Sequence, residues 1–77
     1  MPRIELFGTA SCAYTREMRE WLEVRRVVFD EYDVEIDATA RERMRAMAGA
    51  QRTVPVLVED GRVTQIGWQG HGCVVGE

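Results

Sequence analysis

The hydrophobic period of this sequence alternates between that of strands and that of helices, and this alternation restricts the fold more than any other feature. Polar and apolar residues alternate from Arg3 onward, and the segment becomes apolar by Phe7, which indicates a short strand with a buried face. From Ser11 onward the apolar side chains recur at helical spacing, opposite a charged face. This spacing predicts a helix over residues 12–24, with Ser11 as its N-cap and with two core side chains: Trp21 and Leu22.

The same two periods follow once more. A β-branched and aromatic segment over residues 27–34 predicts a second strand, one face of which holds three apolar side chains: Val28, Tyr32 and Val34. Asp37 and Thr39 both offer N-caps for the helix that follows, and Gly49 is the residue type that usually ends a helix. We therefore expect a strand, a helix, a strand and a helix in the first two thirds of the chain.

The remaining third predicts a β-hairpin. An apolar run at residues 54–58 and a strand-like segment at 62–66 flank Asp60-Gly61, which is a strong signal for a two-residue turn. The order β-α-β-α-β-β implies one right-handed parallel crossover and a final antiparallel pair, hence an α/β fold with a mixed sheet covered by helices. With 77 residues the chain has room for a single domain, 1–77, and its glycine-rich end leaves a final helix short or missing.

The charge balance argues against partners that are bound by bulk electrostatics. The chain has 10 basic and 13 acidic residues, a net charge of -3, and every basic residue is an arginine. We therefore expect neither nucleic acid nor an anionic membrane as a partner. No apolar run approaches the roughly 20 residues of a membrane helix, and the first residues lack the apolar stretch of a signal peptide. These observations predict a cytoplasmic protein.

Cys12 is the candidate nucleophile. It stands where the first loop becomes the first predicted helix, and there the helix dipole and unpaired backbone N–H groups favour the thiolate and lower the pKa of the thiol. Thr15, three residues later, can donate a hydrogen bond to the charged sulfur. The alternative for Cys12 is a small buried side chain without chemistry.

A second signal is Thr53-Val54-Pro55 at the mouth of a predicted strand. Proline cannot donate to a sheet ladder, so it belongs at the first residue of a strand or at an edge, and the Val54–Pro55 bond can be cis there. Alone, this tripeptide is only the start of a strand. Together with Cys12, it is a far more specific sign of a reactive thiol site than either signal is alone.

These motifs resemble those of the glutaredoxins over nearly the whole chain. Cys12-Ala13-Tyr14-Thr15 stands where that family has Cys-Pro-Tyr-Cys, Thr53-Val54-Pro55 matches its Thr-Val-Pro, and Gly67-Trp68 falls where it has Gly-Gly or Gly-aromatic. The resemblance is closest to the glutaredoxin-like group named Uxx-star, some members of which have selenocysteine at the place of Cys12.

The resemblance implies a thioredoxin fold and a thiol-disulfide oxidoreductase. It assigns Cys12 as the nucleophile, Tyr14 as a wall of the site, and Val54 and cis-Pro55 as a ledge that lends backbone groups to an extended peptide or to glutathione. Glutathione is thus an expected co-substrate, protein disulfides are expected substrates, and no tightly bound cofactor is implied. We take the full substrate-binding set as Tyr14, Arg52, Thr53, Val54, Pro55, Gly67 and Trp68.

The chain departs from the family motifs in ways that affect the chemistry. Thr15 replaces the second motif cysteine, so the motif is monothiol, and a mixed disulfide must be resolved by glutathione, by another protein or by Cys73. Thr9 stands where many glutaredoxins have the lysine that pairs with a glutathione carboxylate. Gln69-Gly70-His71 replaces their aspartate pair. Arg52 is then a candidate partner for a carboxylate.

The expected function is reduction of disulfides or glutathionylated proteins through Cys12, with Thr15 in support and Cys73 as a candidate resolving thiol. Two alternatives stay open: a redox-inert peptide-binding module with the same fold, and a peroxide-reducing thiol protein. Two cysteines and one histidine are a poor zinc set, so we expect no metal. Because no final helix is predicted to cover one sheet face, we expect a monomer or a weak homodimer.

Overall fold

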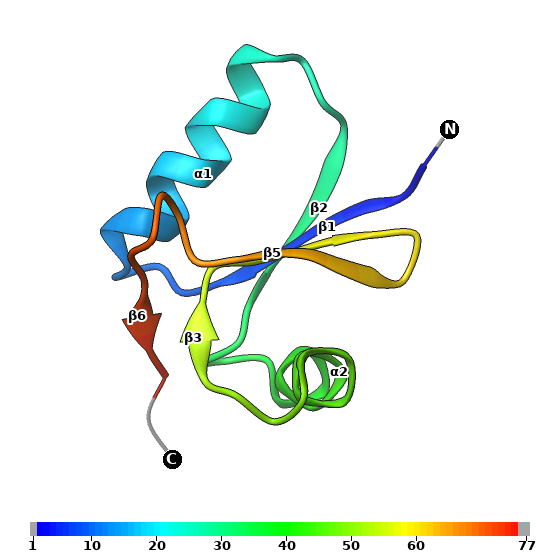
Figure 1. Ribbon diagram of the computed structural model, residues 1–77, viewed down its shortest axis with the longest axis vertical. Helices are drawn as coiled ribbons and strands as arrows, with labels where there is room; N and C mark the ends of the chain where they lie inside the picture. The colour runs from blue at the N-terminus through cyan, green and yellow to red at the C-terminus, as the bar shows by residue number, and fades with distance from the viewer. Residues whose placement is uncertain (1, 76–77) are drawn as a thin grey trace.

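The structure, a computed structural model, describes residues 2–75 (Figure 1). Its elements in chain order are β1 (Ile4–Gly8), α1 (Ala13–Val24), β2 (Phe29–Asp33), α2 (Ala38–Ala48), β3 (Thr53–Val54), β4 (Val56–Glu59), β5 (Arg62–Ile66) and β6 (Cys73–Val74). The predicted α/β order is confirmed. Pro55 divides the apolar run at 54–58 into β3 and β4, and β6 is a strand that the sequence pattern did not predict.

The main sheet is mixed, as predicted. Its strand order is β2-β1-β4-β5; β1 and β2 are parallel, whereas β4 is antiparallel to both β1 and β5. Beside it lies a small second sheet in which β3 and β6 are antiparallel. After β5 the described chain contains a turn and β6 but no helix, in agreement with a final helix that is short or missing.

The two helices cover opposite faces of the main sheet (Figure 1). Adjacent residues of a strand point to opposite faces, so Leu6 and Phe7 of β1 lie in different clusters. The α1-side cluster consists of Leu6, Met18 and Leu22. The α2-side cluster is larger and also receives the loop after β1, the end of β3 and the C-terminal segment; it consists of Phe7, Cys12, Val34, Ala40, Met44, Val54, Val56, Val58 and Val75.

Local signals predicted the hairpin turn and both ends of α2. Gly49 ends α2 in the left-handed conformation with φ 74°. Asp60 and Gly61 both have positive φ, 51° and 81°, as the two-residue hairpin requires. Of the two candidate N-caps of α2, Asp37 is the cap, since its carboxylate accepts a 3.0 Å hydrogen bond from the N–H of the third helical residue. Thr39 lies inside the helix.

Two predictions of side-chain position are wrong. Val28 is 82% exposed, because the N–H of Val27 donates to the carbonyl of Leu22 at 3.0 Å and closes the end of α1, so that the strand begins only after Val28. Trp21 is 40% exposed rather than in the core, and its ring lies beside that of Trp68. Leu22 faces the sheet and is buried, as predicted.

Glu5 is a buried carboxylate that the sequence pattern did not reveal. It is 2% exposed on β1, with Arg43 Nη2 at 2.9 Å and Arg3 Nη2 at 3.3 Å. The Tyr32 hydroxyl donates to it at 3.2 Å. The hydrogen bond to Glu5 raises the pKa of Arg43 above its ordinary value. The cluster ties α2 to the sheet on the same face as the α2-side cluster.

Candidate thiol redox site

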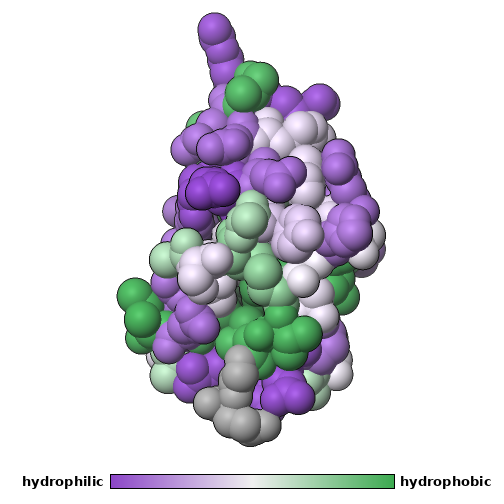
Figure 2. All heavy atoms as spheres, turned by 90° about the vertical axis from the view of Figure 1, so that its left-hand side faces the viewer, coloured by the Kyte–Doolittle hydropathy of each residue, from purple (hydrophilic) through white to green (hydrophobic). Residues whose placement is uncertain are grey.

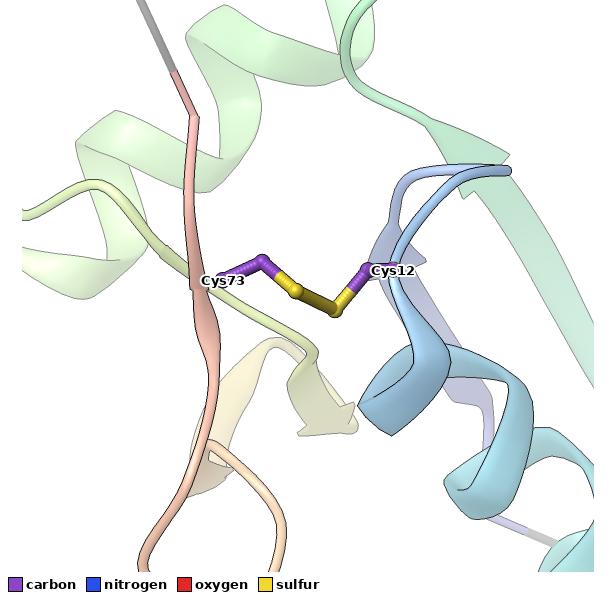
Figure 3. The surroundings of a disulfide bond; sticks show 2 residues. All are labelled: Cys12 and Cys73. Atoms are coloured by element: carbon purple, nitrogen blue, oxygen red, sulfur yellow. A yellow bond between two sulfur atoms is a disulfide. The ribbon is translucent and has the colours of Figure 1, made fainter.

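Cys12 and Cys73 form a disulfide bond with a Cα–Cα distance of 6.0 Å. The two side chains point toward each other, one from the start of α1 and the other from the C-terminal segment (Figure 3). Cys12 is 2% exposed and belongs to the α2-side cluster, whereas Cys73 is half-buried and packs against it. The fold therefore joins the motif cysteine to a residue 61 positions away in the sequence.

Cys12 is itself the N-cap of α1, and the prediction of Ser11 as the cap is wrong. The N–H of Cys12 donates to the Thr9 carbonyl at 3.3 Å, which makes a turn before the helix. The Cys12 carbonyl then accepts from the N–H of Arg16 at 3.1 Å, so the helical ladder starts one residue later than expected. No side-chain hydrogen bond caps this helix start. A thiolate at Cys12 would face the positive end of α1 and its N–H donors, and both lower the pKa of a cysteine.

Thr15 is completely buried in the first turn of α1. Its side chain lies against Gly8 so closely that a Cβ on Gly8 would overlap it. Its hydroxyl has no hydrogen-bond partner among residues 2–75, so the expected bond to the Cys12 sulfur is not made in the disulfide form. A buried donor without a partner therefore lies one helical turn from the redox cysteine.

Val54 and Pro55 are the residues that we expect to form a ledge for the substrate, and Val54 lies in the same cluster as Cys12. The Val54–Pro55 peptide bond is cis, and both residues are buried. Thr53 and Val54 constitute β3, whose register pairs Val54 with Cys73. On the other edge of β3, the Gln51 side chain accepts from the N–H of Thr53 at 2.8 Å and donates to its carbonyl at 3.2 Å. Gln51 thus satisfies the backbone groups that point away from β6, a role that no local signal in the sequence indicated.

A tight turn after β5 brings the C-terminal segment back to β3. Gly67, at φ 83°, donates from its N–H to the Pro55 carbonyl at 2.7 Å, and a Cβ there would meet the His71 carbonyl oxygen. Trp68 and His71 exchange two backbone hydrogen bonds of 2.6 and 2.9 Å. The two residues between them have positive φ, as in a two-residue hairpin turn. The predicted Gly67-Trp68 motif therefore places the segment that follows it.

Three residues of the C-terminal segment contact the site and were not predicted as site residues. The His71 ring stacks on Tyr14, with centroids 5.4 Å apart and an interplanar angle of 15°. Gly72 lies so close to β3 that a Cβ would overlap the Thr53 methyl group and the Val54 carbonyl. Val75 is 5% exposed. The glycines of this segment indicated a flexible end, whereas their close approach to β3 depends on tertiary contacts.

Trp68 is placed differently from our expectation, whereas the role of Arg52 as a partner for a carboxylate stays a prediction. The indole of Trp68 packs against the α1-side cluster, 5.7 Å from the ring of Trp21, and its Nε1 donates to Glu17 at 3.2 Å. It is thus directed toward the helix rather than toward the cysteines. Arg52 has an exposed side chain, and its backbone carbonyl is the group that contacts the C-terminal segment, accepting from the N–H of Val75 at 2.8 Å.

Among residues 2–75, no group of three or more His, Cys, Asp and Glu side chains is arranged to hold a metal ion. Neither described helix is long and apolar enough to cross a membrane. A surface pocket lies at the far end of β1 from Cys12 and contains no thiol, hydroxyl or imidazole; it is formed by Pro2, Arg3, Ile4, Val28, Phe29 and Asp30.

Comparisons with known proteins agree with this geometry. Residues 4–64 match the model of the family described as Glutaredoxin. An uncharacterized glutaredoxin-like 8.6 kDa protein in the rubredoxin operon of Clostridium pasteurianum is 30% identical over 60 residues, which cover 78% of this chain and 79% of that protein. The crystal structure of the thioredoxin-like protein BC3987 superposes with a TM-score of 0.76 at 31% identity, covering 87% of this chain and 89% of that one.

Glutaredoxin 1 from Francisella tularensis, complexed with cacodylate, has the same fold, with a TM-score of 0.65 at 18% identity and coverage of 88% of this chain and 85% of that one. The fold is thus thioredoxin-like. The assignment to the Uxx-star group within the family stays a prediction. The family match over most of the chain and the 30% identity to a glutaredoxin-like relative show that this chain belongs to the glutaredoxin family.

Proposed function

We propose that this protein is a thiol-disulfide oxidoreductase in which Cys12 is the nucleophile and Cys73 is the resolving thiol. The glutaredoxin family supplies the coarser part of this proposal, a thiol-redox protein that acts with glutathione and protein disulfides. The observation that supports the finer part is the Cys12–Cys73 disulfide. It brings a second thiol to a motif in which Thr15 has replaced the usual second cysteine.

The proposed reaction consists of two successive thiol-disulfide exchanges. The Cys12 thiolate attacks one sulfur of a substrate disulfide, forming a mixed disulfide and releasing the other substrate sulfur as a thiolate. The Cys73 thiolate then attacks the Cys12 sulfur, forming the Cys12–Cys73 bond and releasing the second substrate thiolate. Two electrons pass from the protein to the substrate, and two protons come from the protein thiols by way of solvent. Glutathione or a protein dithiol restores the reduced protein by the reverse exchanges.

The residues around Cys12 support its role as the attacking group. The start of α1 favours a thiolate, and a low pKa speeds attack near neutral pH. The Thr15 hydroxyl, three residues after Cys12, is a buried donor without a partner among the described residues. In the reduced protein we expect it to donate to the Cys12 thiolate, which would lower the pKa of that thiol further.

The test is reduction of a glutathionylated peptide with glutathione as the reductant, comparing wild type, Cys12→Ser and Cys73→Ser. We expect Cys12→Ser to fall to the uncatalysed rate. Without added glutathione, Cys73→Ser should retain a covalent Cys12 adduct after reaction with the peptide, which intact-mass measurement detects, whereas the oxidised wild type should weigh two hydrogen atoms less than the reduced form. An active Cys12→Ser protein, or oxidised wild type with only intermolecular adducts, contradicts the proposal.

The rate of Cys12 alkylation as a function of pH, measured in Cys73→Ser, separates the oxidoreductase from a redox-inert binding module. An oxidoreductase requires a midpoint well below that of an ordinary thiol. An ordinary midpoint together with no disulfide reduction favours the module. Reduction of peroxide without reduction of disulfides would instead favour a peroxide-reducing thiol protein.

A further inference from the structure

We propose that the C-terminal segment His71–Val75 occupies the binding site of the protein's own substrate. The substrate is then an extended polypeptide whose cysteine follows a small residue and precedes, by two positions, a buried aliphatic residue. This inference rests on the proposed function, because it takes Cys12 as the nucleophile. It adds the substrate's local sequence, which neither the family match nor the disulfide states.

The backbone of the C-terminal segment pairs with β3 as a bound peptide would. β6 runs antiparallel to β3, with Val54 opposite Cys73 and Thr53 opposite Val74. The N–H of Val75 extends the pairing to the Arg52 carbonyl at 2.8 Å. An extended peptide that adds to a free strand edge is held in this way, through main-chain hydrogen bonds that do not depend on its sequence. The cysteine of this internal strand is joined to the nucleophile, which is where a substrate cysteine must be.

The side chains along this strand differ in how closely they are confined by the protein. One position before the cysteine, Gly72 lies where a Cβ would overlap the Thr53 methyl group and the Val54 carbonyl. Two positions after the cysteine, Val75 is 5% exposed within the α2-side cluster. Between them, Val74 is 71% exposed. The site therefore requires a small residue at the position before cysteine and an aliphatic residue two after it, and it leaves the intervening position free.

Figure 2 shows the face that bears α1 and the C-terminal segment. Hydrophobic side chains gather over its lower half, around the region of β6, whereas the upper half is mostly hydrophilic. Two positions before the cysteine, the His71 ring stacks on Tyr14, with ring centroids 5.4 Å apart. A planar side chain at that position of a substrate would have the same partner.

The C-terminal segment and the substrate compete for one edge of β3. The outer edge of β3 is taken by the side chain of Gln51, through bonds of 2.8 and 3.2 Å to Thr53. The inner edge pairs with one strand at a time, so the segment must leave when the peptide binds. When Cys73 returns to attack the Cys12 sulfur, its strand replaces that of the substrate. Release of the reduced substrate is thus coupled to formation of the Cys12–Cys73 bond, and no additional reductant is needed for this step.

The test uses reduced, full-length Cys73→Ser protein and short blocked peptides whose cysteine bears thionitrobenzoate, a chromophore that is released when Cys12 attacks the peptide sulfur. The parent peptide has His-Gly-Cys-Val-Val. One variant has valine in place of the glycine, and another has serine two positions after the cysteine. The matched control has serine directly after the cysteine, where Val74 is exposed. Each rate is divided by that of the same peptide with a small free thiol, which removes differences in intrinsic reactivity.

We expect both variants to react at least about tenfold more slowly than the parent. The valine variant would overlap Thr53 and Val54, and the serine variant loses the burial of one valine side chain, which is worth at least that factor. The control should stay within about twofold of the parent, since its side chain faces solvent. Equal rates for all four peptides, with rapid release from dithionitrobenzoate itself, overturn the inference and leave the proposed function standing. No release from any disulfide above that of Cys12→Ser/Cys73→Ser overturns the proposed function.

A change in the segment itself tests the competition. Adding Val75→Ser to Cys73→Ser removes the apolar anchor of the segment, so the parent peptide should react faster, by up to about tenfold. An unchanged or lower rate in a folded variant shows that the segment does not compete with the substrate and overturns this part of the inference. The peptide series does not depend on this variant.

Discussion

The Thr15 hydroxyl lacks a hydrogen-bond partner within residues 2–75 in the oxidised form, and we expect it to gain one in the reduced form. In the disulfide form it is fully buried and has no hydrogen-bond partner among the described residues. Leaving a buried hydroxyl without a partner costs roughly 1–3 kcal/mol. A thiolate at Cys12 can accept this hydrogen bond, whereas a disulfide sulfur is a weak acceptor. We therefore predict that this unpaired hydroxyl destabilises the oxidised form and gains a hydrogen bond in the reduced one.

Replacement of Thr15 by valine, which has nearly the same shape, should affect the two redox states in opposite directions. The free energy of unfolding of the oxidised protein should rise by about 1 kcal/mol in urea denaturation, because an unpaired polar group is removed. In reduced Cys73→Ser protein, the pKa of Cys12 should rise, as seen in its alkylation rate against pH. Thr15→Ser keeps the hydroxyl and is the control. If Thr15→Val leaves the pKa of Cys12 unchanged, Thr15 only fills space.

At the scale of the element, β6 is a strand of two residues whose position depends on the turn before it and on close approach to β3. A strand this short has little stability of its own. Gly67 and Gly70, with φ of 83° and 82°, allow the chain to turn, and Gly72 allows it to approach Thr53 and Val54. The redox pair is thus assembled by residues that have no thiol chemistry.

Gly72→Ala should make the disulfide easier to reduce. The added methyl group overlaps β3, and overpacking of this kind costs about 1–3 kcal/mol. Because the docked segment holds Cys73 beside Cys12, we expect the equilibrium constant for reduction by glutathione to rise about tenfold. Alkylation and mass measurement in glutathione redox buffers give this constant. Gly70→Asn is the control, since it has open space and asparagine tolerates a left-handed backbone; an equal shift in that variant would contradict the explanation.

At the scale of the whole molecule, the disulfide links the start of α1 to the C-terminal segment across 61 positions of sequence. In the chain-entropy view, a cross-link over a loop of this length stabilises the native state by about 4 kcal/mol. Small domains have only about 5–15 kcal/mol of stability in total. Reduction should therefore weaken the fold noticeably while leaving the main sheet, to which β6 does not belong, in place.

We expect reduced wild type and Cys12→Ser/Cys73→Ser to unfold with a free energy lower by about 2–4 kcal/mol than oxidised wild type in urea denaturation. The far-ultraviolet circular dichroism of all three should be nearly the same before unfolding, because both helices and the four-stranded sheet persist. Equal stability of the oxidised and reduced forms would contradict the chain-entropy estimate for this cross-link. Loss of the folded spectrum on reduction would show that the disulfide holds the whole domain together.

Local signals predicted those parts of the fold that depend on near neighbours in the sequence. The alternating periods predicted the order of strands and helices, and Asp60-Gly61 and Gly49 predicted a turn and a helix end from their backbone freedom. The same reasoning placed Trp21 in the core and did not reveal the burial of Glu5, although Trp21 is exposed and Glu5 is buried beside Arg43. Burial depends on what packs against a face, and period alone does not contain that information.

By itself, the sequence determined the order of the elements, the cysteine at the start of the first helix and the proline-bounded strand, because each depends on residues that are neighbours along the chain. Only the tertiary structure decided that Cys73 meets Cys12, that Trp68 turns toward α1, and that the C-terminal segment pairs with β3. The pairing of two-residue strands has no period of its own to detect. It arises when the turn after β5 brings the segment to a backbone edge that Gly72 is small enough to approach.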